Sequence, residues 1–189
     1  MKRIKGISFN SPTVLTFTAI SFVVLVADLV TKGAVGGFLA VRFSSWLDPL
    51  MYLRMFTHIF AHASIEHFTS NFMMILVVGP LAEEKYGSSR LAVMIIITAV
   101  VTGLINILLF KNIILLGASG IAFMLILLAS ATNIRDGYIP LTLILVAVFY
   151  IGNEFLSQIF IADNISRISH ILGGLCGAIF GFVSKPKRR

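Results

Sequence analysis

The amino-acid sequence predicts an all-α membrane protein with six transmembrane helices and a long interfacial first loop. Of its 189 residues, 58% are hydrophobic and 12% are charged, which is about half the charged fraction of an ordinary soluble domain. The mean hydropathy of +0.98 excludes a water-soluble globule. It also excludes a disordered chain, because such chains are poor in apolar residues. We therefore expect residues 1–189 to form a single membrane domain.

Six apolar stretches are long enough to cross a bilayer, which takes roughly 20 residues. They lie at 12–31, 64–82, 90–110, 118–135, 139–160 and 164–183. The first follows a basic start, as a signal peptide does, but it is longer than the apolar part of a signal peptide. We interpret it as a membrane anchor. Six spans place both ends of the chain on the same side.

The basic residues predict which side that is. With both ends cytoplasmic, ten of the fifteen lysines and arginines lie inside, as the positive-inside rule requires. These ten are Lys2, Arg3, Lys5, Lys85, Arg90, Arg135, Lys185, Lys187, Arg188 and Arg189. Because the positive charges flank apolar spans, we interpret them as topology signals and expect no nucleic acid partner. The sequence predicts an integral multi-pass membrane protein with cytoplasmic termini.

The connection from 32 to 63 mixes apolar and polar residues, which is typical of a segment lying at the membrane interface. Its Arg54 is expected either to contact phosphate headgroups or to hydrogen-bond backbone. His58 and His62 are spaced as a metal-binding pair could be, but no third ligand is evident, and interfacial structural histidines are favoured. Cys176 lies alone in an apolar span, so we expect no disulfide framework and no thiolate cluster for a metal.

Polar side chains inside the spans are expensive to bury in lipid and are therefore candidate functional residues. They are His67, Asn71, Ser119, Glu154 and His170. The second, fourth and sixth spans run in the same direction, so four of these residues fall at a similar depth near the outer face. Three roles stay open for Glu154 in the fifth span: it acts in gating, pairs with a cation such as Arg167, or extends to the nearby outer surface.

Ser119 and His170 have the chemistry of a catalytic dyad. A serine hydroxyl needs a neighbouring base to become a nucleophile, and histidine is the usual base. Gly117 and Gly120 flank the serine, and the short helix that follows indicates a loop entering the membrane. At the start of that helix, free N–H groups favour a developing oxyanion. His67 and Asn71, four residues apart on one helical face, could donate to the same anion.

The last span carries glycines at a spacing that allows close helix packing. Gly173 and Gly177 share one face, so a neighbouring helix can approach closely. If that neighbour is the fourth span, which begins with small residues, the imidazole of His170 would come within reach of Ser119.

These residues, in this order, resemble the rhomboid family of intramembrane serine proteases from about Arg54 to Gly181. The matching motifs are Arg54-Met-Phe-Thr-His58, His62, His67-Phe-Thr-Ser-Asn71, Gly79-Pro-Leu-Ala-Glu83-Glu-Lys-Tyr-Gly87, Gly117-Ala118-Ser119-Gly120 and His170-Ile-Leu-Gly173-Gly-Leu-Cys-Gly177. Each motif alone is weak, but three of them fall at the outer ends of the second, fourth and sixth spans.

The resemblance implies a six-helix rhomboid-like bundle with Ser119 as nucleophile and His170 as general base. It assigns oxyanion or substrate binding to His67, Asn71, Gly117 and Ala118. It assigns structural support to Arg54, Glu83, Gly120, Phe123, Gly173 and Gly177. It implies membrane-spanning protein substrates entering between the second and fifth spans, no metal or cofactor, and a bacterial plasma membrane. Natural substrate, cleavage-site preference and oligomeric state stay open.

Two positions depart from the family pattern. Leu53 stands where the family often has tryptophan before the arginine, so lipid contacts of the first loop are expected to differ. Phe123 stands where the family often has tyrosine, so the ring that can contact His170 lacks a hydroxyl. Neither change removes a catalytic group.

The sequence thus favours an intramembrane serine endopeptidase that cuts transmembrane helices near the outer face. One alternative is a rhomboid-like protein that binds membrane clients without cleaving them, although such a relative is expected to lack Ser119 or His170. A small transporter is the other alternative, but transporter sites lie near the membrane midplane rather than the outer face.

Overall fold

The computed structural model describes residues 6, 8–131, 138, 141, 144, 145, 148, 149 and 164–184, with the backbone alone for 164–167. The named elements of the described residues are helices, and an isolated β-bridge joins Val41 to Leu115. Its helices are α1 (Pro12–Val30), α2 (Ala34–Leu39), α3 (Pro49–Thr57), the 3-10 helix η1 (His58–Phe60), α4 (Ile65–Tyr86), α5 (Ser88–Leu109), α6 (Ser119–Ala131) and α8 (Asn164–Val183).

Three of these helices, α1, α4 and α5, are long and apolar enough to cross a membrane. The helices α6 and α8 are apolar as well, over shorter described lengths. The predicted spans 12–31 and 164–183 coincide with α1 and α8 to within one residue. The predicted fifth span, 139–160, lies outside the described residues apart from isolated positions, so the number of six spans stays a prediction.

Helix α4 continues past the predicted end at residue 82 to Tyr86, with Pro80 inside it. Proline removes one helical hydrogen bond. Membrane-spanning helices tolerate this loss because neighbouring groups can satisfy the freed carbonyl oxygen. The helix ends at Gly87, whose φ of +86° suits glycine. The extra turn carries Glu83, whose carboxylate accepts the N–H groups of Thr13 at 2.8 Å and Val14 at 3.0 Å. Glu83 therefore caps α1, in line with its predicted supporting role.

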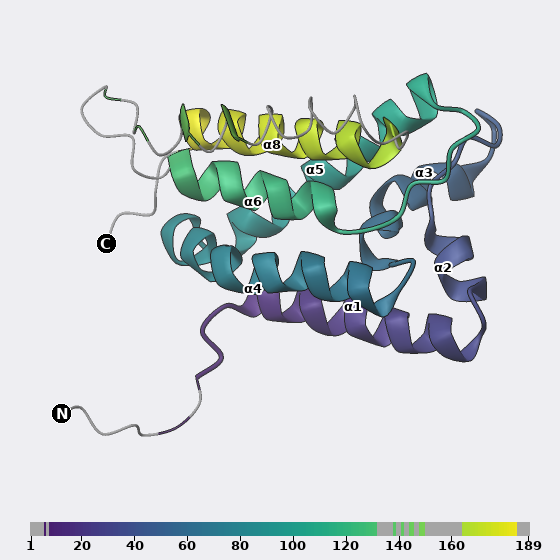
Figure 1. Cartoon of the computed structure of the whole chain (residues 1–189), viewed down its shortest axis with the longest axis horizontal. Helices are drawn as coiled ribbons and strands as arrows, with labels where there is room; N and C mark the ends of the chain where they lie inside the picture. The colour runs from purple at the N-terminus through teal and green to yellow at the C-terminus, as the bar shows by residue number, and fades with distance from the viewer. Residues whose placement is uncertain are drawn as a thin grey trace.

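The helices alternate in direction along the bundle (Figure 1). The helices α4, α6 and α8 begin at the end of the molecule where α2 and α3 lie, whereas α1 and α5 begin at the opposite end. This is the arrangement predicted for the second, fourth and sixth spans. It gathers the first turns of three helices beside the first loop.

Helix α6 lies in the core of the bundle. Most of its residues are buried, because a helix that is apolar on all sides must be surrounded by protein or lipid. Around it pack Ile75 of α4, Leu91 of α5 and Cys176 of α8 in one apolar cluster. The first residue of α6, Ser119, is itself only 9% exposed. A serine is thus held inside the protein at the start of a central helix.

Glycines bring α8 against α6, as the sequence predicts. A Cβ atom added at Gly173 would overlap the carbonyl oxygen of Gly120, and one added at Gly177 would overlap that of Met124. The two backbones are therefore in contact, with no room for a side chain between them at these positions.

The first loop is folded against α5 rather than being an irregular connection. Met51 and Met55 of α3 are buried, and a Cβ atom at Gly103 of α5 would lie 2.9 Å from Cα of Met55. On the other side of the loop, Trp46 and Leu47 are exposed. Exposed apolar side chains in a membrane protein fit an interfacial position, which stays a prediction.

Candidate functional site

The loop before Ser119 is held by the first loop at three successive points. Val41 and Leu115 exchange both backbone hydrogen bonds, each 2.9 Å long. The N–H of Gly117 donates to the carbonyl oxygen of His58 at 2.9 Å, and the N–H of Ala118 donates to Nε2 of His62 at 3.2 Å. The backbone that presents Ser119 is therefore positioned by residues far away in the sequence.

His62 must be neutral to do this. Because Nε2 accepts a hydrogen bond, the ring proton sits on Nδ1, which lies 3.2 Å from the carbonyl oxygen of Phe60 and donates to it. Burial, together with the neighbouring imidazole of His67, lowers the pKa of His62 to about 4. At neutral pH the imidazole is uncharged and able to accept from Ala118.

His58 is likewise enclosed by protein. Its Nδ1 lies 3.2 Å from the carbonyl oxygen of Arg54, and its Nε2 lies 3.4 Å from the hydroxyl of Thr102. Burial lowers its pKa to about 4. His58 and His62 are only 1% and 2% exposed, so the protein encloses both side chains, and their position at the membrane interface stays a prediction. Within the described residues, no three His, Cys, Asp or Glu side chains gather as a metal site would require.

His67 and Asn71 of α4 both face Gly117, in the loop before Ser119. The hydroxyl of Ser64 caps this helix by accepting the N–H of His67 at 3.1 Å. A Cβ atom at Gly117 would lie 2.8 Å from Nε2 of His67 and 3.8 Å from Nδ2 of Asn71. With a φ of +118°, Gly117 adopts a conformation that favours glycine. The imidazole and the amide therefore approach the backbone just before Ser119.

Asn71 carries a buried donor that the fold leaves unused. Its side chain is 8% exposed, and Nδ2 has no hydrogen-bond partner among the described residues. An unsatisfied buried donor costs about 1–3 kcal/mol, so such groups are rare in folded proteins. A donor of this kind next to a candidate nucleophile is suited to an incoming oxygen atom.

His170 reaches the same region from α8. Its ring contacts that of Phe123, with centroids 4.5 Å apart and planes at 44°, and it lies close enough to His67 for the two imidazoles to interact electrostatically. A Cβ atom at Gly120 would lie 3.2 Å from the carbonyl oxygen of Ser169. The neighbours of Ser119 on α6 thus contact the residue that precedes His170. Phe123 contacts His170 without the hydroxyl of a tyrosine.

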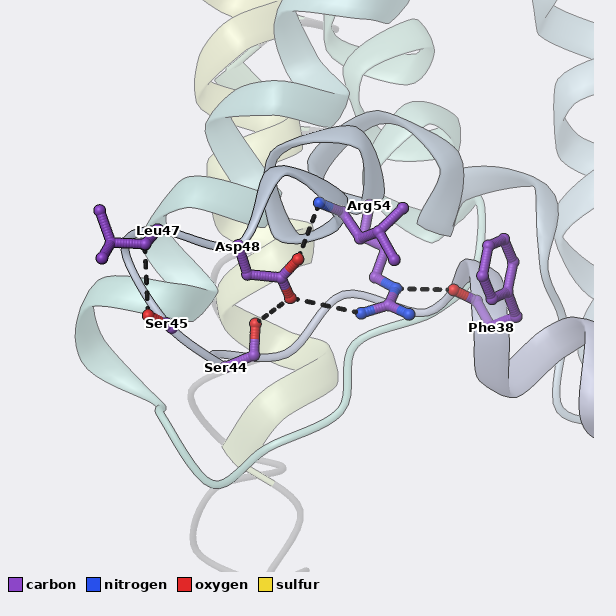
Figure 2. Close-up of polar contacts among 7 residues, drawn as sticks. Phe38, Ser44, Ser45, Leu47, Asp48 and Arg54 are labelled. Atoms are coloured by element: carbon purple, nitrogen blue, oxygen red, sulfur yellow. Dashed lines mark hydrogen bonds and ion pairs between the residues drawn. The ribbon is translucent and has the colours of Figure 1, made fainter.

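Arg54 lies away from this group and holds the first loop together (Figure 2). Its Nε donates to the carbonyl oxygen of Phe38 at 2.8 Å, and its guanidinium lies 5.3 Å from the centre of the Phe38 ring. Asp48 pairs with Arg54 at 4.0 Å and accepts the N–H of Leu50 at the start of α3. The hydroxyl of Ser44, 2.6 Å from the Asp48 carboxylate, is the main reason that the pKa of Asp48 is lowered. Of the two roles expected for Arg54, the structure shows the backbone hydrogen bond.

Of the other residues singled out in the sequence, the structure describes Leu53 and Cys176 but not Glu154. Leu53 is half exposed on the first loop, and Cys176 is buried in the core. Glu154 lies outside the described residues, as does the side chain of Arg167.

Three contributors to the site were not predicted as such: His58, His62 and Thr102. The signal for the two histidines was their position just ahead of the second span in a mostly apolar segment. Their spacing allowed a metal-binding pair and favoured interfacial structural histidines. Local pattern does not reveal the distant loop that they bind. Thr102 gave no signal, since a threonine within a helix commonly bonds its own backbone, as Thr102 also does.

The fold and these contacts define a class: a helical membrane protein with a buried group of serine, histidine and asparagine side chains where three helices begin. The sequence matches the Rhomboid domain over residues 49–187. The chain therefore belongs to the rhomboid family, as its motifs indicated. This family includes intramembrane serine proteases and acts on membrane proteins within the bilayer. No curated protein matches the sequence.

Proposed function

We propose that this chain is an intramembrane serine endopeptidase in which Ser119 is the nucleophile and His170 the general base. The supporting observation is the arrangement at the start of α6. A buried serine in a rhomboid chain is approached from α8 by the segment that carries His170 and from α4 by His67 and Asn71. Each residue type suits one step of acyl transfer.

In the proposed reaction, His170 removes the proton from Oγ of Ser119 as this oxygen attacks the carbonyl carbon of the scissile peptide bond. The tetrahedral intermediate then expels the amine, which receives the proton from His170. The resulting acyl-enzyme ester is hydrolysed by water, with His170 again acting as base and then as acid. The ring of Phe123 limits where the imidazole can move.

The intermediate carries a negative oxygen that needs donors. The N–H groups of the first turn of α6 have no carbonyl partners within their own helix, and Nδ2 of Asn71 is an unused donor beside them. His67 adds a second side chain on the same face. We assign these groups, with the backbone of Gly117 and Ala118 fixing the loop, to oxyanion stabilisation and substrate binding.

The proposed substrates are membrane-spanning helices cut near the outer membrane face. A helix hides its carbonyls in hydrogen bonds, so a substrate must unwind locally, and small or helix-weakening residues near the cut favour this. In the same proposal, substrates enter between α4 and the predicted fifth span. The chain forms a single domain over 1–189 in a bacterial plasma membrane, with both termini cytoplasmic. The distribution of basic residues supports the orientation.

Reaction with a fluorophosphonate tests the nucleophile. The folded, detergent-purified protein is expected to gain one adduct, located by mass on Ser119, and Ser119→Ala and His170→Ala are expected to lose it. Ser130→Ala is the matched control, because it removes a hydroxyl that bonds to Ile126 further along α6. If the folded protein forms no adduct and cleaves no membrane-spanning substrate, the non-catalytic client-binding alternative replaces the protease.

Asn71→Ala separates an oxyanion role from a structural one. Loss of one oxyanion donor lowers kcat by about 10²–10³-fold. Because Nδ2 has no partner in the described fold, the same change should leave the melting temperature nearly unaltered. A large loss of thermal stability with a proportionate loss of activity would assign Asn71 to the fold instead.

A further inference from the structure

A second candidate site lies at the end of the bundle opposite Ser119, where α5 begins and α8 ends (Figure 1). A groove of about 310 Å³ runs between these two helices. It is lined by Ser89, Arg90, Val93, Met94, Ile97, Phe180 and Ser184. The groove therefore has an apolar floor and a polar end.

The lining on α5 forms one helical stripe. Arg90, Val93, Met94 and Ile97 follow the i, i+3, i+4, i+7 spacing of a single face. Val93 and Ile97 remain 53% and 43% exposed. Met94 is buried at the floor of the groove. Because α5 is long and apolar enough to span the membrane, the exposed Val93 and Ile97 are available to acyl chains, and Arg90 lies toward the end of the span.

The polar end of the groove carries a basic side chain and two hydroxyls. Arg90 is the charged side chain among the described lining residues, and the hydroxyls of Ser89 and Ser184 accompany it. In the sequence, Lys185, Lys187, Arg188 and Arg189 follow Ser184 directly. Basic residues beside the end of a membrane helix attract anionic lipid, at about 1 kcal/mol for each charge near the surface.

We propose that this groove binds an anionic phospholipid of the bilayer. One acyl chain lies along Val93, Ile97 and Phe180, and the phosphate lies at Arg90 and the two serine hydroxyls. The site is separate from the one assigned to peptide cleavage, and the proposal does not depend on that activity.

The molecule offers an internal comparison. A second groove, of about 360 Å³, lies between α1 and α5, with Thr16, Ile20, Phe56 and Ile96 among its lining. Its described lining contains no charged side chain. It can take an acyl chain but has nothing to select a headgroup, so the anionic preference should belong to the groove at Arg90.

Native mass spectrometry of the full chain, titrated with phosphatidylglycerol and with phosphatidylcholine, tests the proposal. The unmodified protein is expected to retain phosphatidylglycerol preferentially, and Arg90→Gln to reduce this preference about fivefold. Arg90→Lys is expected to restore most of it. Val93→Trp, which fills the groove, is expected to lose one bound phosphatidylglycerol.

Ile20→Trp is the matched control, since it adds the same ring to the α1–α5 groove at a residue that is 45% exposed. It is expected to leave the anionic preference unchanged. The proposal is overturned if Arg90→Gln and Val93→Trp retain phosphatidylglycerol as the unmodified protein does, or if Ile20→Trp lowers the preference equally. Melting temperatures measured in parallel confirm that each variant is folded.

Discussion

The contact between α6 and α8 differs in kind from the contact between α1 and α4. The first is made by backbone, with Gly173 and Gly177 lying against carbonyl oxygens of α6. The second is made by side chains: the rings of Phe17 and Phe72 lie 5.3 Å apart, and a Cβ atom at Gly79 would meet a methyl group of Val14. Backbone contacts cannot adjust by changing a rotamer, whereas side chains can. The proposed dyad residues therefore sit on the less adaptable of the two contacts.

The largest effect is expected where the backbones meet. Gly173→Ala places a methyl group on the carbonyl of Gly120, so α8 must move away from α6. Overpacking of this kind costs about 3 kcal/mol or more, and the displacement of His170 should abolish fluorophosphonate labelling. Unfolding in mixed micelles and labelling of the surviving folded fraction measure the two effects.

Gly37→Ala is the control for this change, because a Cβ atom there has no heavy atom within 4 Å. It should be silent in both measurements. A stable, fully labelled Gly173→Ala protein would show that α8 can move away from α6 at little cost. The α6–α8 contact would then be no more rigid than the α1–α4 contact.

Acid should act next most strongly, through His62, the histidine that joins the first loop to the segment before α6. His62 has a pKa of about 4 in the fold and an ordinary value of 6.5, so between these values the unfolded chain binds a proton that the folded chain does not. Stability conferred by the neutral imidazole is thus complete above pH 6.5 and declines as pH falls toward 4. From pH 7 to 5 the loss is about 2 kcal/mol.

His62→Gln tests this assignment, since the amide oxygen can still accept from Ala118 but does not titrate. Its free energy of unfolding should decline less between pH 7 and 5 than that of the unmodified protein. His58 titrates in both proteins and cancels in the difference. Identical pH profiles would assign the acid sensitivity to other groups.

A smaller effect is expected from the polar contact between α4 and α1. Glu83→Gln keeps the shape of the side chain but replaces one acceptor by a donor, so one of the N–H groups of Thr13 and Val14 loses its partner. The expected cost is about 1.5 kcal/mol, because hydrogen bonds to charged groups are among the stronger ones. Labelling of Ser119 in the folded fraction should persist, and its loss would connect α1 to the site more directly than the contacts indicate.

Gly79→Ala should have the smallest effect. The new methyl group meets a Val14 methyl at 2.8 Å, and the side chains can shift to relieve the overlap. A destabilisation of about 1 kcal/mol with full labelling is expected. A cost as large as that of Gly173→Ala would show that the two contacts are equally rigid.

The sequence predicts the features of the fold that depend on residues close together in the chain. The lengths of the apolar stretches predicted the positions of α1 and α8. The alternating direction of the spans predicted that α4, α6 and α8 begin at the same end of the bundle. The spacing of Gly173 and Gly177 predicted the close packing of α8 against a neighbouring helix. His67 and Asn71 fall on one face because they are one turn apart. The family followed from motifs in order.

What the sequence did not predict depends on pairs of distant residues. The carboxylate of Glu83 caps α1 across 69 residues or more. Glu83 lies in the last turn of α4, beyond the apolar stretch from which the end of this helix was predicted. The bridge between Val41 and Leu115 joins two segments without strand-like alternation. The sequence favours structural histidines at positions 58 and 62, but it does not identify the backbone groups that they bind.

The hydrogen bond from Ala118 to His62 also bears on the order in which the chain folds. The two residues are 56 positions apart, and α4 and α5 lie between them. During synthesis, the first loop is made long before Ala118. Until then, Nε2 of His62 cannot accept its hydrogen bond from the N–H of Ala118. The hydrogen bonds between the first loop and the segment before α6 therefore form only after α4 and α5 have been made.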